Sequence, residues 1–242
     1  MEPTERSEVT TRPPRPPIRR SGIVVGRLLG VPVYLAPSWL LLAVVVTVVY
    51  GGVVAERRPE LGTGAYLVGF GFVVALAVSV LLHELGHAVT CRRYGIGVRA
   101  ITLEMLGGYT EMEDEAPRPS VEALVALAGP LVSGVLGVLG VVAVLVTPTE
   151  TVLFELAFQF AASNILVAVF NLLPGLPLDG GRALRAGVWA ASRDKHLGSR
   201  IAGWTGRGVA VVVVLALAAG WAYGVIGPFG LVFAGIVAMV LW

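Results

Sequence analysis

Two histidines and a glutamate stand in an otherwise apolar stretch, "SVLLHELGHAVT", which contains His83, Glu84 and His87. Residues four apart project from one face of a helix, so the two imidazoles lie one turn apart and can chelate a tetrahedral metal ion. Glu84 is rotated by about 100° from His83 and is placed to act as a general base on water. This HExxH arrangement provides two zinc ligands and a general base. The alternative is a buried structural cluster, but an unpaired glutamate in apolar surroundings costs several kcal/mol.

Two histidines leave a catalytic zinc site one protein ligand short. The remaining histidine, His196, lies in the polar stretch "SRDKHLGSR", where a solvated loop residue is favoured. Asp179 in "NLLPGLPLDGGRALR" is the better candidate, because Pro174 and Pro177 break a helix there. Irregular backbone at membrane depth is tolerated where protein covers it or water reaches it. On its own, "LDGG" is equally well explained as a generic turn. Because the two histidines leave the metal site one ligand short, Asp179 becomes the leading candidate for the third ligand.

The composition indicates a polytopic membrane protein. Of the 242 residues 56% are hydrophobic and 14% are charged, and the mean hydropathy is +0.82, whereas soluble domains carry about 25% charged residues. The net charge of +2 gives no indication of nucleic-acid binding. With a single cysteine, Cys91, the chain has no intrachain disulfide.

We predict an all-α fold of about six transmembrane helices. A spanning helix needs about 20 apolar residues, and the segments that qualify are 37–54, 65–89, 121–146, 152–173 and 208–226. A sixth segment, 229–242, would form only about 21 Å of helix, so we expect a helix cut short. Residues 1–27, rich in Pro and Arg, are expected to be a disordered basic cytoplasmic tail that touches anionic lipid.

The distribution of Lys and Arg predicts the orientation. Sixteen of the 18 lie in the tail and in the connections after the second and fourth spans, and the other two are Arg57 and Arg58. The N-terminus and those connections are therefore expected in the cytoplasm. His83 and His87 precede Arg92 by nine and five residues, which places them about 8–14 Å inside the cytoplasmic end of the second span.

A short β-hairpin is predicted after the second span. In "VRAITLEMLGGYTEMEDE" apolar and polar residues alternate from Ile101 to Met105, which favours a strand, and Gly107-Gly108 is predicted to be the hairpin turn. Two roles remain open: an edge strand for an extended substrate, or a loop that caps the bundle. The acidic run of Glu111, Glu113, Asp114 and Glu115 is interpreted as a solvated face.

"HELGH" on the second span together with "NLLPGLPLDGG" after a later span resembles the site-2 protease family of intramembrane zinc metalloproteases. The resemblance covers most of Val33–Trp242. It implies one Zn²⁺ per chain, held by His83, His87 and Asp179, with Glu84 as the catalytic base. It also implies cleavage of a peptide bond within or near a transmembrane segment of a membrane-protein substrate, in regulated intramembrane proteolysis.

Further motif matches suggest where substrate would bind. Asn171 and Pro174 match the family's N-x-x-P element, and Asn164 lies two helical turns earlier on the same face. We expect these three residues, with Gly107 and Gly108 of the hairpin, to contact substrate. "AGPLVSG", residues 128–134, resembles the family's AGP element, but Ser133 stands where an Asn is often found, which weakens the case for a polar role at that position and nothing else.

The protease domain is expected to be residues 28–242. The connections between spans are too short for the PDZ domain that some members carry, and the short sixth span fits the branch with a C-terminal CBS domain, which is absent here. Glycines in "GPLVSGVLGVLG" permit close helix packing or a homodimer. The rival function is a zinc transporter or zinc sensor with the same ligands, for which Glu84 would have no use.

Overall fold

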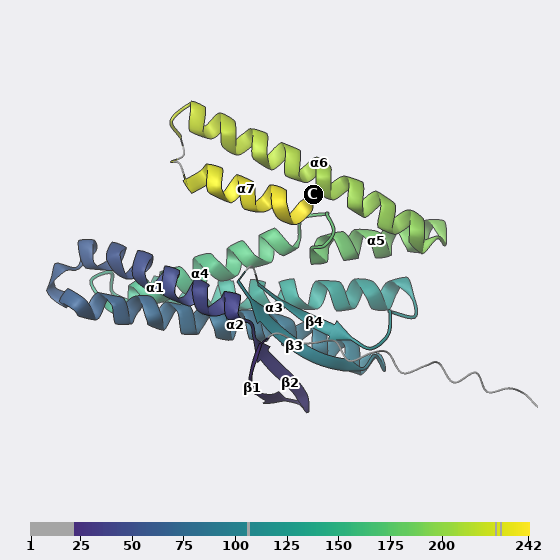
Figure 1. Ribbon diagram of the computed structural model, residues 1–242, viewed down its shortest axis with the longest axis horizontal. Helices are drawn as coiled ribbons and strands as arrows, with labels where there is room; N and C mark the ends of the chain where they lie inside the picture. Colours follow the sequence, from purple (N-terminus) through teal and green to yellow (C-terminus); the bar gives the residue numbers. More distant parts are fainter. Residues whose placement is uncertain (1–21, 106, 226, 228) are drawn as a thin grey trace, which may run out of the picture.

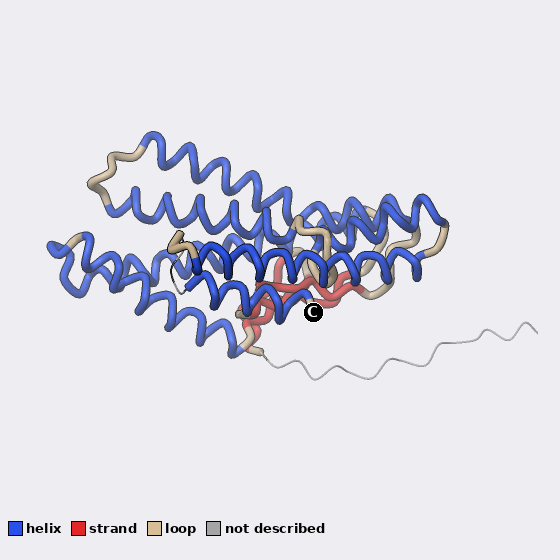
Figure 2. The backbone as a smooth tube through the Cα atoms, turned by 90° about the horizontal axis from the view of Figure 1, so that it is seen from above, coloured by secondary structure: helices blue, strands red, loops and turns tan. Residues whose placement is uncertain are grey.

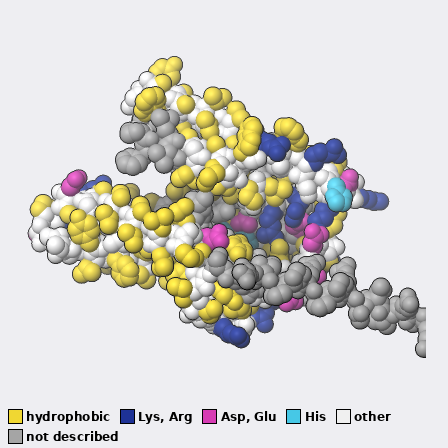
Figure 3. Space-filling model, viewed as in Figure 1, with side chains coloured by type: hydrophobic (Ala, Val, Ile, Leu, Met, Phe, Trp, Pro, Cys, Tyr) yellow, Lys and Arg dark blue, Asp and Glu magenta, His cyan; other side chains and the backbone are white. Residues whose placement is uncertain are grey.

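Long apolar helices dominate the computed structural model, which describes residues 22–105, 107–225, 227 and 229–242. Five helices are long and apolar enough to cross a membrane: α1 (Pro37–Arg57), α2 (Ala65–Arg93, preceded by a 3₁₀ turn, Pro59–Gly64), α3 (Pro119–Val146), α4 (Val152–Asn171) and α6 (Lys195–Ala222). They confirm the prediction of a multi-pass membrane protein. Their exposed surface is largely hydrophobic, and the charged side chains gather where α5 and the start of α6 lie (Figures 1 and 3).

The sixth predicted span is α7 (Phe229–Leu241), which packs against α6 (Figures 1 and 2). With 13 residues it measures about 20 Å. A small cluster joins the two helices to the segment that follows α4, with Ala210, Val237 and Leu241 buried beside Leu178.

The connection between the fourth and fifth spans is helical, which corrects the predicted polar loop. Helix α5 (Asp179–Ser192) follows the bend at Pro174 and Pro177, and α6 begins at Lys195. The segment was predicted to be a loop because charged residues and glycines interrupt its apolar residues, but it forms a helix whose buried residues are Asp179, Gly180, Gly181 and Ala186. His196, predicted to be a loop residue, lies exposed in the first turn of α6.

The start of α6 is fixed by Asp194. Its carboxylate accepts hydrogen bonds from the backbone N–H groups of His196 (2.8 Å) and Leu197 (3.1 Å). Such an N-cap satisfies donors that the first helical turn leaves unpaired. The bonds from Leu197 and His196 lower the pKa of Asp194, because they favour its charged form.

A four-stranded sheet lies beside the helices, in the order β1-β2-β3-β4. Strands β1 (Ile23–Leu28) and β2 (Val31–Leu35) form an antiparallel hairpin, and β3 (Val98–Glu104) and β4 (Gly107–Met112) form a second. The two hairpins join through parallel pairing of β2 with β3. The first hairpin was not predicted: residues 23–27, assigned to a disordered tail, belong to β1, and residues 1–21 lie outside the described part.

The second hairpin confirms the predicted strand but not the predicted turn. Glu104 pairs with Gly107, and Leu103 pairs with Gly108, so both glycines are the first residues of β4 and the turn precedes them. Gly107 has a φ of 140°, which a residue with a side chain rarely adopts. That backbone requirement, rather than a place in the turn, explains this glycine.

The sheet packs against the part of α2 that carries the histidines. Val33 of β2 and Ile101 and Leu103 of β3 are buried with Val80 and Ala88 of α2 in one apolar cluster. Because Val80 and Ala88 flank the HELGH segment, the cluster fixes this end of α2 against the sheet.

Candidate metal centre

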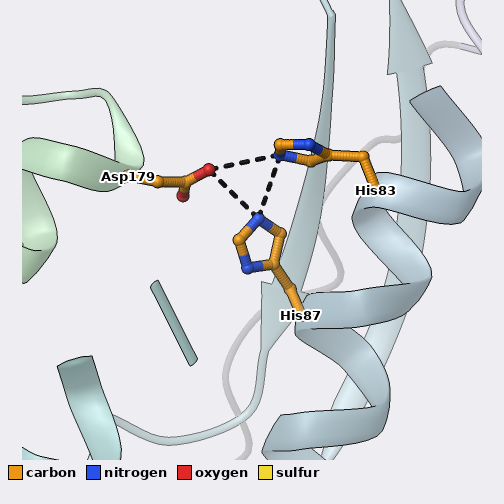
Figure 4. A group of neighbouring side chains, drawn as sticks. All are labelled: His83, His87 and Asp179. Atoms are coloured by element: carbon orange, nitrogen blue, oxygen red, sulfur yellow. Dashed lines mark hydrogen bonds and ion pairs between the residues drawn. The ribbon is translucent and has the colours of Figure 1, made fainter. Parts of the chain in front are cut away.

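Three donor atoms converge at the interface of α2 and α5. His83 Nε2, His87 Nε2 and Asp179 Oδ2 lie 3.2 Å from one another in all three pairs (Figure 4). The histidines project from consecutive turns of α2, and the aspartate is the first residue of α5. All three residues are buried.

The spacing of these donors fits one tetrahedral ion. Four ligand atoms at 2.0–2.1 Å from zinc are separated from one another by about 3.3 Å, close to the 3.2 Å observed. Two imidazole nitrogens and one carboxylate oxygen are also a ligand set that zinc accepts, and a fourth position is left for water or substrate. The site can therefore hold one metal ion.

Helix α3 contacts the Nδ1 atoms of both imidazoles, on the opposite side of each ring from the converging Nε2 atoms. His87 Nδ1 donates a hydrogen bond to the Val125 carbonyl oxygen (2.7 Å), and His83 Nδ1 lies 2.9 Å from Ser133 Oγ. When Nδ1 carries the proton, the Nε2 lone pair is free to bind a metal. Ser133 thus has a polar contact with His83, a role for which the sequence alone gave only weak support.

Glycines let α3 approach the histidine helix closely. A Cβ atom on Gly129 would lie against Nε2 of both His83 and His87, and one on Gly86 would lie 2.9 Å from the Ala128 carbonyl oxygen. Any side chain at Gly129 would fill the space between the imidazoles and α3. The glycine of the AGP element is therefore needed to leave room for the donor atoms.

Asp179 is placed by the tight bend that precedes α5. A Cβ atom on Gly180 or Gly181 would collide with the backbone of Leu172 or Gly175, so α5 can start close against this bend only because both residues are glycine. While Oδ2 faces the imidazoles, Asp179 Oδ1 lies 3.9 Å from an Arg182 guanidinium nitrogen. The carboxylate thus directs a single oxygen toward the histidines.

Glu84 lies between α2 and strand β4. Its side chain is buried, and Oε2 accepts a hydrogen bond from Thr110 Oγ1 of β4 at 2.8 Å. A Cβ atom on Gly108 would come within 2.8 Å of Glu84 Cγ, so β4 lies directly against the glutamate. Of the two hairpin glycines, Gly108 is in contact with the HELGH segment.

The other predicted substrate contacts lie apart from the donor atoms. Asn164 is only 1% exposed, and its amide donates to Ser79 Oγ (3.0 Å), one turn before His83 on α2. Asn171 bonds to a carbonyl oxygen of its own helix, and Pro174 is exposed. Within the described part of the chain, no hydrogen bond joins these three residues to His83, His87 or Asp179.

Sequence reasoning missed the supports of this site. The Val125 carbonyl gives no signal in a sequence, because any residue supplies one. Gly129 and Ser133 lie in the "AGPLVSG" motif and could have been found from it. Thr110 lies between Tyr109 and Glu111 in β4, so nothing in the sequence distinguishes it from a solvent-facing strand residue.

Comparison with known proteins decides the family. The model of peptidase family M50 matches residues 71–160 and 147–216, which include both histidines and Asp179. The chain belongs to peptidase family M50. Over 91% of this chain and 93% of the other, its structure also resembles the site-2 protease from Methanocaldococcus jannaschii, with a TM-score of 0.62 and 25% sequence identity. The predicted site-2 protease family and fold are confirmed.

Two curated relatives in this family are described as candidate zinc metalloproteases. One is sll0528 of Synechocystis sp., 38% identical over 78% of this chain and 50% of the relative. The other is Rip3 of Mycobacterium tuberculosis, 40% identical over 70% of this chain and 44% of the relative. This M50 chain spans about half the length of these relatives.

Proposed function

We propose that this chain is a zinc metalloendopeptidase that cleaves a peptide bond within or near the transmembrane segment of a membrane-protein substrate. The observation that carries the proposal is the buried triangle of His83, His87 and Asp179 donors, with Glu84 next to the first histidine. A zinc ion held by these three residues would polarise the scissile carbonyl and make water more acidic.

The chain's own residues supply the proton transfers. The Glu84 carboxylate takes a proton from the attacking water and passes it to the leaving amine. The Thr110 hydroxyl holds Oε2 of that carboxylate, which fixes its orientation relative to the donor triangle. Burial keeps bulk water away from the reacting bond.

Strand β4 is a suitable place for the substrate backbone. A helix hides its carbonyl groups in i to i−4 hydrogen bonds, so a helical substrate must first unwind. β4 is an edge of the sheet, and it contacts Glu84 through Gly108 and Thr110. An extended substrate that pairs with β4 would present its backbone beside the base. Asn164, Asn171, Pro174 and Gly107 stay predicted substrate contacts.

The basic residues favour a site near the cytoplasmic face. α2 ends at Arg92 and Arg93, one to two turns beyond His87, and its other end adjoins the stretch with Arg57 and Arg58. By the positive-inside rule the N-terminus and the metal centre lie toward the cytoplasm. Substrates reached there would include membrane-tethered regulators, as in regulated intramembrane proteolysis.

Substitution of Glu84 tests the proposal against the zinc transporter or sensor. Glu84→Gln, purified in detergent beside wild type and Asp179→Asn, should keep one zinc per chain and lose cleavage of a transmembrane test peptide. Asp179→Asn should lose zinc and cleavage together. Cleavage by Glu84→Gln at the wild-type rate, read by mass spectrometry, would refute Glu84 as the catalytic base. Zinc binding by wild type without cleavage of the peptide would refute the hydrolase and favour the rival.

Backbone-methylated peptides test the pairing with β4. In an added strand, alternate N–H groups of the substrate point toward β4. Peptides N-methylated at odd or at even positions of the unwound segment should therefore differ strongly in cleavage rate. Equal rates for the two series would exclude strand pairing, and zinc content would be unaffected throughout.

A further inference from the structure

We propose that Glu122 of α3 and Arg185 of α5 form a positioning pair that sets the place of Asp179 relative to the histidines. Glu122 is only 1% exposed, and both Nε (2.6 Å) and a terminal nitrogen of Arg185 contact its Oε1. The inference rests on the metal centre of the proposed function. It assigns a role to two residues that touch neither the metal ligands nor a substrate.

One side of α3 supports the whole centre. Val125 and Ser133 hold the two imidazoles of α2, and Gly129 lies against both. Glu122 precedes Val125 by about one turn and holds Arg185, which lies in the same short helix as Asp179. Helix α3 is thus the common frame for ligands from two segments that are 96 residues apart.

The Glu122–Arg185 ion pair connects the first turn of α3 to α5. A cavity of about 560 Å³ lies here, lined by Met112, Glu122, Arg182, Arg185 and Lys195 together with residues 113–116. Helices α3 and α5 also pack directly against each other, and beside this cavity the pair adds a charged contact to that packing. If one partner is removed, the other is left without its counter-charge, and the start of α5 can shift relative to α3.

The spare oxygen of Glu122 shows how specific the pairing is. Among the described residues no hydrogen-bond partner is found for its buried Oε2, while two Arg185 nitrogens converge on Oε1. The contact is therefore one-sided and depends on the length and fork of the arginine. Arg185→Lys keeps the charge but loses this geometry, so it should weaken zinc binding less than Arg185→Gln.

The test measures zinc affinity by chelator competition and the thermal midpoint of the metal-free full chain in detergent. Glu122→Gln and Arg185→Gln should each bind zinc 10- to 100-fold more weakly than wild type, the range for residues that orient ligands. The charge-swapped pair Glu122→Arg with Arg185→Glu should regain most of that loss. If the charge-swapped protein does not fold, Arg185→Lys replaces it in the test, because it should weaken zinc binding less than Arg185→Gln does.

A matched control lies at the other end of the bundle. Glu155→Gln removes the ion pairs with Arg57 and Arg58, so it should lower the thermal midpoint and leave zinc affinity unchanged. Unchanged zinc affinity in Glu122→Gln and Arg185→Gln would overturn the inference. If Glu155→Gln also lost zinc affinity in proportion to its thermal midpoint, the losses in the pair variants would reflect stability alone, and this result would overturn the inference as well. If wild type binds zinc but does not cleave the peptide, the proposed protease function is refuted, whereas the proposed role of Glu122 and Arg185 in zinc binding is unaffected.

Discussion

A single methyl group at Gly129 should empty the metal centre without unfolding the protein. In Gly129→Ala the new Cβ would lie 2.5 Å from His83 Nε2 and 2.7 Å from its Cδ2, where ordinary contacts begin at 3.4 Å. The imidazole must therefore retreat by about 1 Å, well outside the ±0.2 Å tolerance of a zinc–ligand bond. Because the Cβ also meets His87 Nε2, both nitrogen ligands are displaced.

The expected loss is at least 100-fold in zinc affinity, which is about 2.7 kcal/mol. The stability of the metal-free protein should change little. Alanine is favoured over glycine within a helix by about 1 kcal/mol, and this offsets part of the crowding, which costs about 1–3 kcal/mol. Zinc content by mass spectrometry, chelator competition and thermal unfolding with and without zinc separate the two effects.

Gly134→Ala is the matched control in the same helix. A Cβ there would have no atom within 4 Å, so this variant should bind zinc like wild type and be as stable or slightly more stable. Wild-type zinc affinity in Gly129→Ala would refute the reasoning, since it would mean that α3 does not border the donor atoms as described.

Three further predictions concern the residues around the donor triangle. Ser133→Ala removes the partner of His83 Nδ1 and should weaken zinc binding about tenfold, measured by chelator competition, while Ser133→Asn restores a polar partner and much of the affinity. Thr110→Val removes the donor to Glu84, and a bond to a charged group is worth about 1.5–3 kcal/mol, so cleavage should fall about 10- to 100-fold at normal zinc content; equal rates would argue against this contact in the active enzyme. Zinc at 1,000 times its Kd should stabilise wild type by about 4 kcal/mol, and Asp179→Asn should show little of this shift in a thermal melt.

The ligand residues could be predicted from the sequence because their spacing is local or their chemistry is rare. His83 and His87 are fixed relative to each other by the pitch of one helix. Asp179 could be paired with them only because few ionisable residues occur at membrane depth. The long apolar helices followed from composition in the same way, since spanning the hydrocarbon core demands about 20 apolar residues.

Features that depend on distant partners were not predictable. Strands β1 and β2 are short and carry Gly26 and Pro32, so no clean alternation marks them, and β2 is stabilised by pairing with β3 across two intervening helices. Helix α5 was included in a loop because Pro174 and Pro177 precede it, and because its glycines and charged residues interrupt any long apolar run. The Val125 carbonyl and the approach at Gly129 follow from how α2 and α3 pack, which no local pattern encodes.

The parallel pairing of β2 with β3 has a mechanical consequence for the protein. It joins the residues before α1 to the residues after α2, so the helical hairpin of α1 and α2 is closed at its base by backbone hydrogen bonds. The histidine helix and the sheet are thus one connected unit, and α3 packs against both this unit and the aspartate helix α5. A bound ion would add a direct link between the two ligand segments, and chelation would leave the contacts through α3 as their connection.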